Sequence, residues 1–404
     1  MAELLYLVHR LPYPPNKGDK VRSYHLLRHL ARRHRVHLGT FVDDPADLAH
    51  LDTVRGLCAE FHWERLDPRA SRVRSLMGLA TGEALSLPYY RNAGLQAWVD
   101  RTLAAHPITT SVLFSSPMVQ YVERRDGLRR LVDFVDVDSD KWTQYAQNSR
   151  WPLSWLYRRE GRTLGAFEAE AATRAVASFF VTDAEVALFR KLAPAVRTPV
   201  ESVGNGVDAD YYTPEARGES PYPAGEVPVV FTGAMDYWPN VDAACWFAGA
   251  VLPLLRRRHP GVRFYVVGMR PTAEVRALAG PAVVVTGTVP DIRPYLAHAA
   301  VAVAPLRIAR GIQNKILEAM AAGKAVVAAR ACADPIEGMP GREFLVATEA
   351  ADFAEEVGAL IADPARAAAI GRSARACVLA HYSWEAQLAR MDRYLDTAPA
   401  MELA

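Results

Sequence analysis

The feature that most constrains the fold of this chain is an end-to-end alternation of short apolar runs with longer amphipathic stretches. Apolar runs of about four to eight residues are typical of buried strands, and the stretches between them have the period of helices, the longest at residues 153–175. Such repeated alternation predicts an α/β fold with parallel sheets covered by helices on both faces. The runs that predict strands are residues 4–8, 36–42, 61–66, 110–114, 131–137, 177–181, 200–203, 227–232, 262–267, 283–286, 301–304, 325–329 and 344–346.

The length of 404 residues predicts about two domains, because single hydrophobic cores stop growing at roughly 250–300 residues. Residues 205–226 are rich in Gly, Pro, Tyr and Asp and have no sustained period, so they are the best domain boundary. We therefore expect two doubly wound, Rossmann-like domains, residues 1–212 and 213–382, facing across a crevice, and a C-terminal helix in residues 383–404. In such sheets ligands bind beyond the carboxyl ends of the strands.

Composition excludes several classes of protein. Lys and Arg total 47 against 45 Asp and Glu, a net charge of only +2, which argues against nucleic acid as a partner. The four cysteines lie far apart without metal-ligand spacing, which argues against a disulfide scaffold and a zinc module. The longest strongly apolar run, residues 243–255, is too short to span a membrane, and the N-terminus lacks the features of a signal peptide. We expect a cytoplasmic protein.

The strand-to-helix loop that begins at Pro305 is the part of the sequence that most clearly indicates a binding site. A glycine lets the backbone approach a ligand closely, and the first N–H groups of the following helix favour an anion. The loop residues that we expect near this anion are Arg307, Arg310 and Gly311.

The helix that follows this loop carries two further candidates. Lys315 in its opening turn can reach the same anion, and Glu318 lies on the same face, where its carboxylate can accept hydrogen bonds from sugar hydroxyls. The alternative is a surface ion pair between Lys315 and Glu318, worth a few tenths of a kcal/mol.

The first strand-to-helix turn of each domain is the usual place for phosphate-binding glycines in doubly wound folds. In the second domain the candidates are Gly233, for close backbone approach, and Asn240, which could instead be an ordinary N-cap. In the first domain Gly18 and Asp19 open a helix that we expect to face the crevice between the domains. The alternative there is a surface loop with Asp19 as the helix cap.

Four carboxylates lie at or near the predicted carboxyl end of the strand in residues 131–137: Asp133, Asp136, Asp138 and Asp140. Alternation places Asp136 and Asp138 near the strand tip, where one of them could orient an acceptor hydroxyl or act as its base. The alternative is that Asp138, or Ser139, only caps the next helix.

With these residues assembled, the chain resembles the retaining nucleotide-sugar glycosyltransferases of glycosyltransferase family 4, which have the GT-B architecture. More narrowly, it is similar to sugar transferases of exosortase-associated exopolysaccharide gene clusters. The motifs that carry the resemblance are the glycine loop ending in Gly18, the turn Val203-Gly-Asn-Gly-Val-Asp-Ala-Asp-Tyr-Tyr-Thr-Pro214, the Phe231-Thr-Gly233 loop, residues 287–292, the stretch from Gly311 to Gly323 with Lys315 and Glu318, and the closing Tyr382-Ser-Trp-Glu385.

The resemblance implies a role for each domain. The second domain would bind the nucleotide diphosphate sugar, with Lys315 at the diphosphate, Glu318 at the ribose hydroxyls and residues 288–292, including Val289, along the base. The first domain would bind the acceptor. The last helix would cross back onto the first domain.

The sequence departs from the family at the donor site. Arg310 stands where the family has an acidic residue eight positions before Glu318, and the usual Arg and Lys of the loop after Gly233 are missing. We expect Arg307, Arg310, Lys315 and the helix N-terminus to neutralise the diphosphate, so no metal or other cofactor is implied.

The family's catalytic histidine has no clear counterpart in the first domain. We therefore assign the catalytic roles to Asp136, Asp138 and Glu318.

The function predicted from the sequence is transfer of a hexose from a nucleotide sugar to a lipid-linked or polysaccharide acceptor, with retention, in exopolysaccharide or cell-envelope glycan synthesis. The alternatives are a nucleotide-sugar 2-epimerase on the same fold and a nucleotide-sugar-binding protein that has lost catalysis. Basic residues beside apolar ones in residues 25–35 and 72–90 predict peripheral contact with an anionic membrane, on the inner face of the plasma membrane. A solvated arginine face on a core-packed helix is the alternative.

Overall fold

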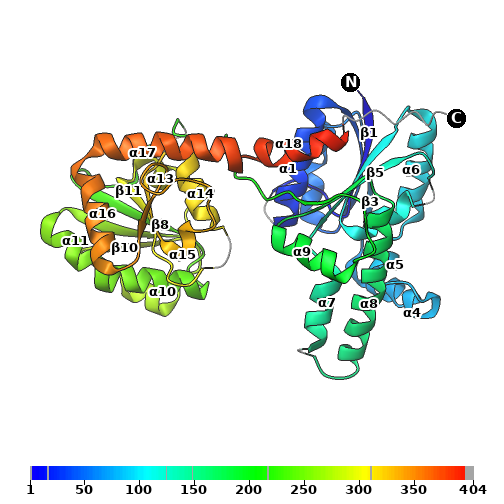
Figure 1. The fold of residues 1–404 in the computed structure, drawn as a ribbon, viewed down its shortest axis with the longest axis horizontal. Helices are drawn as coiled ribbons and strands as arrows, with labels where there is room; N and C mark the ends of the chain where they lie inside the picture. The colour runs from blue at the N-terminus through cyan, green and yellow to red at the C-terminus, as the bar shows by residue number, and fades with distance from the viewer. Residues whose placement is uncertain are drawn as a thin grey trace. The chain divides into compact units, whose positions relative to one another are not determined.

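The computed structural model describes residues 2–15, 18–123, 125–147, 149–215, 218–309 and 312–395. The chain forms two compact units (Figure 1). One comprises the residues up to Asn205 together with those from Leu388 onward, and the other comprises Gly206–Gln387. The sequence placed the changes of domain after residues 212 and 382, and the chain passes between the units after 205 and 387.

The first unit is built on a parallel sheet with seven strands in the described part of the chain, in the order β3-β2-β1-β4-β5-β6-β7. The strand order reverses direction between β1 and β4, which is the arrangement of a doubly wound fold. The strands are β1 (Glu3–Val8), β2 (Arg35–Val42), β3 (Glu60–Arg65), β4 (Thr110–Phe114), β5 (Arg129–Val135), β6 (Ala177–Phe180) and β7 (Val200–Ser202).

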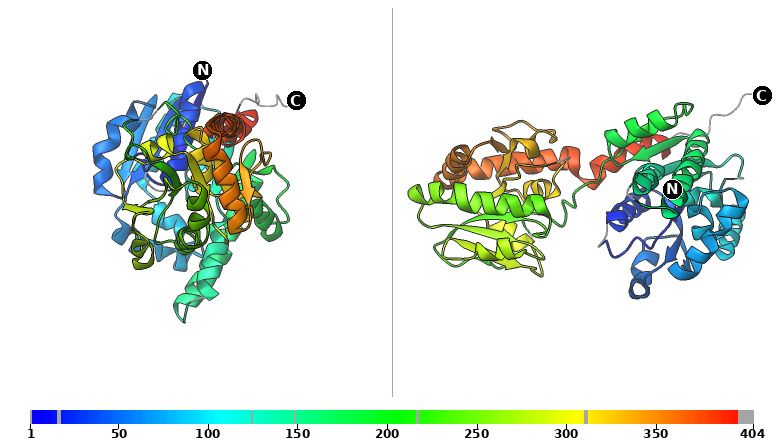
Figure 2. Two further views of the ribbon diagram at one scale, coloured as in Figure 1. Left: turned by 90° about the vertical axis from the view of Figure 1, so that its left-hand side faces the viewer. Right: turned by 90° about the horizontal axis from the view of Figure 1, so that it is seen from below.

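Helices flank this sheet, and two of them form a hairpin that projects away from it (Figure 1; Figure 2, left). The hairpin pairs α7 with α8, the long amphipathic helix expected from residues 153–175. The helices are α1 (Gly18–Arg33), α2 (Leu51–Arg55), α3 (Pro68–Ser75), α4 (Met77–Thr81), α5 (Ser86–Tyr90), α6 (Ala93–Ala105), α7 (Asp138–Gln147), α8 (Leu153–Thr173) and α9 (Asp183–Leu192).

The second unit has the same architecture, a parallel sheet between helices. Its six described strands lie in the order β10-β9-β8-β11-β12-β13. Its strand order reverses between β8 and β11. The strands are β8 (Val227–Thr232), β9 (Val262–Val267), β10 (Val283–Gly287), β11 (Val301–Ala304), β12 (Val326–Ala329) and β13 (Leu345–Ala347). The helices are α10 (Trp238–Trp246), α11 (Leu252–Arg258), α12 (Ala273–Ala277), α13 (Arg293–His298), α14 (Asn314–Ala321), α15 (Arg330–Ala333), α16 (Ala350–Ala362) and α17 (Pro364–Cys377).

The central strands are buried on both faces, as parallel sheets between helices require. In β1 every residue from Leu4 to Val8 is buried, and β11 and β12 are buried along their whole lengths. This burial is why the strands read as unbroken apolar runs in the sequence, and it confirms the predicted α/β class with two doubly wound sheets. No helix in the described ranges is long and apolar enough to cross a membrane.

The last helix, α18 (Trp384–Leu395), ends on the first unit, as the resemblance implied. Its Asp392 accepts from His29 Nε2 at 2.7 Å and pairs with Arg33 at 2.5 Å, both on α1. The Tyr394 hydroxyl donates to Glu201 on β7. These contacts use basic side chains of residues 25–35, in which His25 is itself buried. That stretch is therefore not a free basic face.

A buried ion pair organises the first unit. Arg22 on α1 and Asp133 on β5 are both fully buried, with Nε–Oδ2 and Nη2–Oδ1 separations of 2.8 and 3.1 Å. The Arg22 guanidinium also donates to the Val203 carbonyl at 2.8 Å and to Asn205 Oδ1 at 3.1 Å. Asp133 is thus a structural residue and not one of the exposed carboxylates at the strand tip. The same contacts give Asn205 a structural role at the end of the first unit.

Candidate active site

A pocket of about 580 Å³ lies at the carboxyl ends of β8, β9 and β10 in the second unit. Its walls come from the turns that follow these three strands, from the beginning of α14 and from the linker before β8. This edge of a doubly wound sheet is where ligands bind. The lining residues are Tyr211, Tyr212, Thr232, Gly233, Ala234, Asn240, Gly268, Met269, Thr288, Val289, Pro290, Asp291, Ile292, Ile312, Gln313, Asn314, Lys315 and Glu318.

The turn after β8 requires glycine because the chain approaches itself closely there. Gly233 has a φ of 154° and Gly268 one of 158°. A Cβ on Gly268 would lie 1.6 Å from the Gly233 carbonyl oxygen, and a Cβ on Gly233 would lie 2.7 Å from Asn240 Nδ2. The glycines therefore let the first two strand-to-helix turns and α10 converge on one side of the pocket.

Lys315 is held over the pocket by Asn240. The lysine Nζ donates to Asn240 Oδ1 at 2.6 Å, and Asn240 Nδ2 donates to the Ala234 carbonyl at 2.9 Å. Asn240 is buried inside the first turn of α10, so it orients the lysine and is not the N-cap, a position that Tyr237 occupies. Burial lowers the pKa of Lys315 to about 8. An anion in the pocket would raise this pKa and favour the charged form.

Glu318 lies one turn further along α14 and has a different partner, Tyr212. Burial raises the pKa of Glu318, although the charge of Lys315 and the hydrogen bond from the Tyr212 hydroxyl oppose the shift. Lys315 and Glu318 thus have separate partners inside a pocket, so a surface ion pair does not describe them. Tyr212 was missed from sequence, and its only signal was an aromatic pair, Tyr211–Tyr212, inside a linker.

Not all of the predicted donor residues lie together. Gly233, Asn240, Val289, Lys315 and Glu318 all line the pocket. The exposed Arg307 does not. Its Nε donates to Asp242 at 3.0 Å and its guanidinium lies 5.9 Å from the centre of the Trp246 ring. The structure therefore does not bring Arg307 into the pocket lining, and its role at a diphosphate stays a prediction. Arg310 and Gly311 lie outside the described residues.

In the first unit, Asp136 and Asp138 meet at the carboxyl end of β5, and both contact one lysine. Lys141 Nζ lies 2.7 Å from Asp136 Oδ2 and 3.0 Å from Asp138 Oδ1. Although burial opposes it, the two carboxylates raise the pKa of Lys141. Ser139 is the second residue of α7 and so lies inside the helix, where its hydroxyl donates to Glu168 at 2.6 Å.

The predicted acceptor loop lies beside a histidine that the sequence analysis did not single out. His9 directly follows β1, and its Nε2 is 3.4 Å from Asp19 Oδ2, which also accepts from Arg10 Nη1 at 2.8 Å. The hydrogen bond from His9, followed by the charge of Arg10, lowers the pKa of Asp19 well below its usual range. His9 Nδ1 is buried and finds no hydrogen-bond partner among the described residues. The only sequence signal was its position directly after a strand. Gly18 is the exposed first residue of α1.

Residues 226–363 match the protein family described as "Glycosyl transferases group 1". The match contains β8 to β13 and most of the pocket wall. This part of the chain is therefore a glycosyltransferase domain.

A curated relative supports the same class of enzyme. The chain is 31% identical over 216 residues to the GDP-mannose-dependent alpha-(1-6)-phosphatidylinositol monomannoside mannosyltransferase of Mycolicibacterium smegmatis. The alignment covers 48% of this chain and 56% of that protein, so the chain spans little more than half of the relative's length.

Solved structures show the fold of the whole chain. Sucrose-phosphate synthase from Thermosynechococcus elongatus matches with a TM-score of 0.58 and 17% identity, covering 98% of each chain. The Anabaena protein HepE, solved in complex with UDP, matches with a TM-score of 0.59 and 17% identity, covering 98% of this chain and 100% of that one. These likenesses confirm the two-domain GT-B fold.

Proposed function

We propose that this chain is a retaining glycosyltransferase of family 4 that moves a hexose from a nucleoside diphosphate sugar to a lipid-linked or polysaccharide acceptor. The observation that carries the proposal is the pocket of the second unit, in which Gly233, Lys315 and Glu318 converge beyond the carboxyl ends of the strands. The process that it would serve is exopolysaccharide or cell-envelope glycan synthesis, as in the exosortase-associated transferases that the sequence resembles.

The chemistry of the pocket suits a nucleoside diphosphate. The ammonium of Lys315 and the N-terminal N–H groups of α14 would bind the diphosphate and stabilise the charge that develops on it as it leaves. The carboxylate of Glu318 would accept hydrogen bonds from the ribose hydroxyls, and residues 288–292 would pack along the base. These groups neutralise the leaving diphosphate without a metal ion in the pocket.

The named relatives support a nucleotide sugar as the donor. One uses GDP-mannose, and HepE was also solved with UDP-glucose and with UDP and glucose. The relative's acceptor is a phosphatidylinositol mannoside, which supports a lipid-linked acceptor for this chain.

The first unit would bind the acceptor. Its carboxylates at the end of β5, Asp136 and Asp138, or the His9–Asp19 pair at the end of β1, would activate the acceptor hydroxyl. Both groups lie at the edge of the sheet where doubly wound domains bind ligands.

Acceptor-dependent release of nucleotide tests the proposal. A thermal-shift panel of UDP-, GDP-, ADP- and TDP-sugars first identifies the donor, since a ligand at about 100 times its Kd adds about 2.7 kcal/mol of stability. The donor is then incubated with and without a membrane lipid extract. We expect nucleoside diphosphate release only with the extract. Isomerisation of the donor sugar without an acceptor would instead indicate an epimerase, and binding without turnover would indicate an inactive protein.

We also propose that the protein is cytoplasmic and attaches peripherally to the inner face of the plasma membrane through the first unit. Val73 on α3 is 70% exposed and Met77 on α4 is 60% exposed, both within residues 72–90. Trp151, 81% exposed, lies beside the turn of the α7–α8 hairpin, and Trp155 on α8 is also exposed. Exposed apolar side chains with arginines between them suit an anionic membrane surface.

Vesicle sedimentation tests this attachment. At low salt we expect binding to vesicles of anionic phospholipid, weaker binding to neutral ones, and loss of binding in a Trp151→Ser, Trp155→Ser double variant. Leu192→Ser, which removes an exposed leucine from α9, is the matched control. If the protein binds neither kind of vesicle, the proposed membrane attachment is contradicted.

A further inference from the structure

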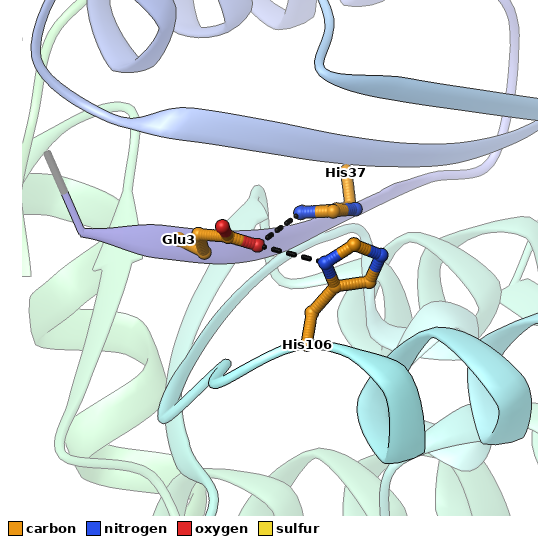
Figure 3. Close-up of side chains that lie close together, drawn as sticks. All are labelled: Glu3, His37 and His106. Carbon is orange, nitrogen blue, oxygen red and sulfur yellow. Dashed lines mark hydrogen bonds and ion pairs between the residues drawn. The ribbon is translucent and has the colours of Figure 1, made fainter.

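Two histidines and a glutamate form a cluster in the first unit that the proposed transfer reaction does not use (Figure 3). Glu3 is the first residue of β1, His37 is the third residue of β2, and His106 directly follows α6. The cluster therefore lies at the amino-terminal edge of the sheet, opposite the edge that carries Asp19 and Asp136. No two of the three are close in sequence, and the adjacency of β1 and β2 brings the first two together.

The side-chain atoms converge on one point. Glu3 Oε2 lies 2.8 Å from His37 Nε2 and 3.1 Å from His106 Nδ1, and the two imidazole rings have centroids 4.3 Å apart. His37 is fully buried, while Glu3 and His106 are partly exposed. One ligand atom from each residue lies within 4.8 Å of the others.

A second carboxylate, that of Glu60, lies on the side of the two imidazoles that faces away from Glu3. Glu60 Oε2 lies 3.1 Å from His37 Nδ1 and 3.7 Å from His106 Nε2, that is, from the ring nitrogens that face away from Glu3. The Trp98 indole N–H donates to Glu60 Oε1 at 2.9 Å. Histidines that bind metal ions almost always donate their second N–H to a carboxylate or carbonyl, which fixes the tautomer and makes the ligating nitrogen more basic.

We propose that Glu3, His37 and His106 bind a divalent transition-metal ion, best matched by Zn²⁺, with Glu60 orienting the imidazole of His37. Two imidazole nitrogens and one carboxylate oxygen are a common ligand set of zinc sites, and a water molecule would take the fourth position. The site is independent of the proposed donor pocket, which belongs to the other unit.

The two distances between Glu3 and the imidazoles need little change to hold the ion. Ligand atoms about 2.05 Å from a tetrahedral ion lie roughly 3.3 Å from one another. The separations of 2.8 and 3.1 Å around Glu3 would open by a few tenths of an ångström. Arg35 is exposed and lies 3.4 Å from Glu3 Oε1, which is not the oxygen that the two imidazoles contact.

Metal titration of the chelator-treated full-length protein tests the site. Zn²⁺ is titrated by calorimetry at pH 7.5, and Co²⁺ is titrated while its visible absorption is recorded, because the intensity of that absorption reports tetrahedral coordination. The variants are Glu3→Gln and His106→Gln, which leave the buried His37 in place, and Glu60→Gln. His381→Ala is the matched control, since that imidazole also faces a carboxylate, 3.5 Å away on Glu337, without the other two ligands.

We expect one equivalent of Zn²⁺ to bind the wild type and the His381→Ala variant. Glu60→Gln should weaken binding by about 10- to 100-fold, as loss of such an outer carboxylate does elsewhere. Glu3→Gln and His106→Gln should weaken it further and abolish the Co²⁺ absorption. No binding to the wild type, or wild-type affinity in Glu3→Gln and His106→Gln, would show that the cluster is only a set of ion pairs. Because nucleotide binding is measured separately, either result leaves the proposed function to its own test.

Discussion

At the scale of single residues, the donor pocket depends on a lysine that burial has made less basic. Burial lowers the pKa of Lys315 to about 8, from an ordinary value near 10.5. A bound diphosphate favours the ammonium form, so binding above pH 8 must include uptake of a proton.

The affinity for a nucleoside diphosphate should therefore be constant below pH 7.5 and fall above pH 8, by up to about tenfold per pH unit. Lys315→Arg keeps its charge throughout this range, so its affinity should not fall. Calorimetry between pH 6.5 and 9.5 measures both. The same slope in wild type and Lys315→Arg would show that another group titrates.

A second prediction at this scale concerns the carboxylates of Asp136 and Asp138. Asp138→Asn, or failing that Asp136→Asn, should reduce turnover strongly and leave nucleotide affinity unchanged, because these residues belong to the first unit. Glu170→Gln, an exposed carboxylate paired with Arg174, is the control. Steady-state rates and nucleotide titrations are compared for each variant. Near-normal turnover in both variants would contradict this role and would indicate that the His9–Asp19 pair activates the acceptor hydroxyl instead.

At the scale of elements, the Arg22–Asp133 pair connects α1, β5 and the turn at Val203–Asn205. Asp133→Asn leaves the buried guanidinium without its counter-charge. We expect it to lower the free energy of unfolding by about 3–5 kcal/mol. Urea denaturation measures the change, and Asp140→Asn, at a partly exposed position on α7, should change the free energy of unfolding by less than about 0.5 kcal/mol. An Asp133→Asn variant as stable as the wild type would contradict the structural role.

Elements were predicted from sequence where local periodicity alone determines them. The apolar runs gave the strands, and the arginine and glycine pattern of the loop before α14 led to Lys315 and Glu318 on that helix. Contacts between distant residues were not predicted. Arg307 donates a hydrogen bond to Asp242, 65 positions away, and Arg22 donates one to Asp133, 111 positions away. Such pairs depend on strand order, which no local pattern contains.

The same reason explains the cluster of Glu3, His37, His106 and Glu60. Each residue alone reads as an ordinary polar residue at the beginning of a strand or the end of a helix. The order β3-β2-β1 places three of them on adjacent strands, and the loop after α6 adds the fourth.

At the scale of the whole molecule, the chain consists of two doubly wound units, and the donor pocket is formed wholly by residues of one of them. Under the proposed function, donor binding depends on residues 206–387 and acceptor activation depends on the first unit. The pocket of the second unit would then bind the nucleoside diphosphate of the donor.

Calorimetric titration with UDP, GDP, ADP and TDP tests this claim most directly. Charge-assisted hydrogen bonds contribute about 1.5–3 kcal/mol, so Lys315→Ala and Glu318→Gln should each weaken the preferred nucleotide by roughly 10- to 100-fold. Lys315→Ala should leave binding of the nucleoside alone unchanged, and Glu318→Gln should weaken it. The exposed Lys191→Ala and the surface-paired Glu356→Gln are controls that should bind as the wild type does. Wild-type affinity in both pocket variants, or no binding of any of the four nucleotides to the wild type, would contradict the account.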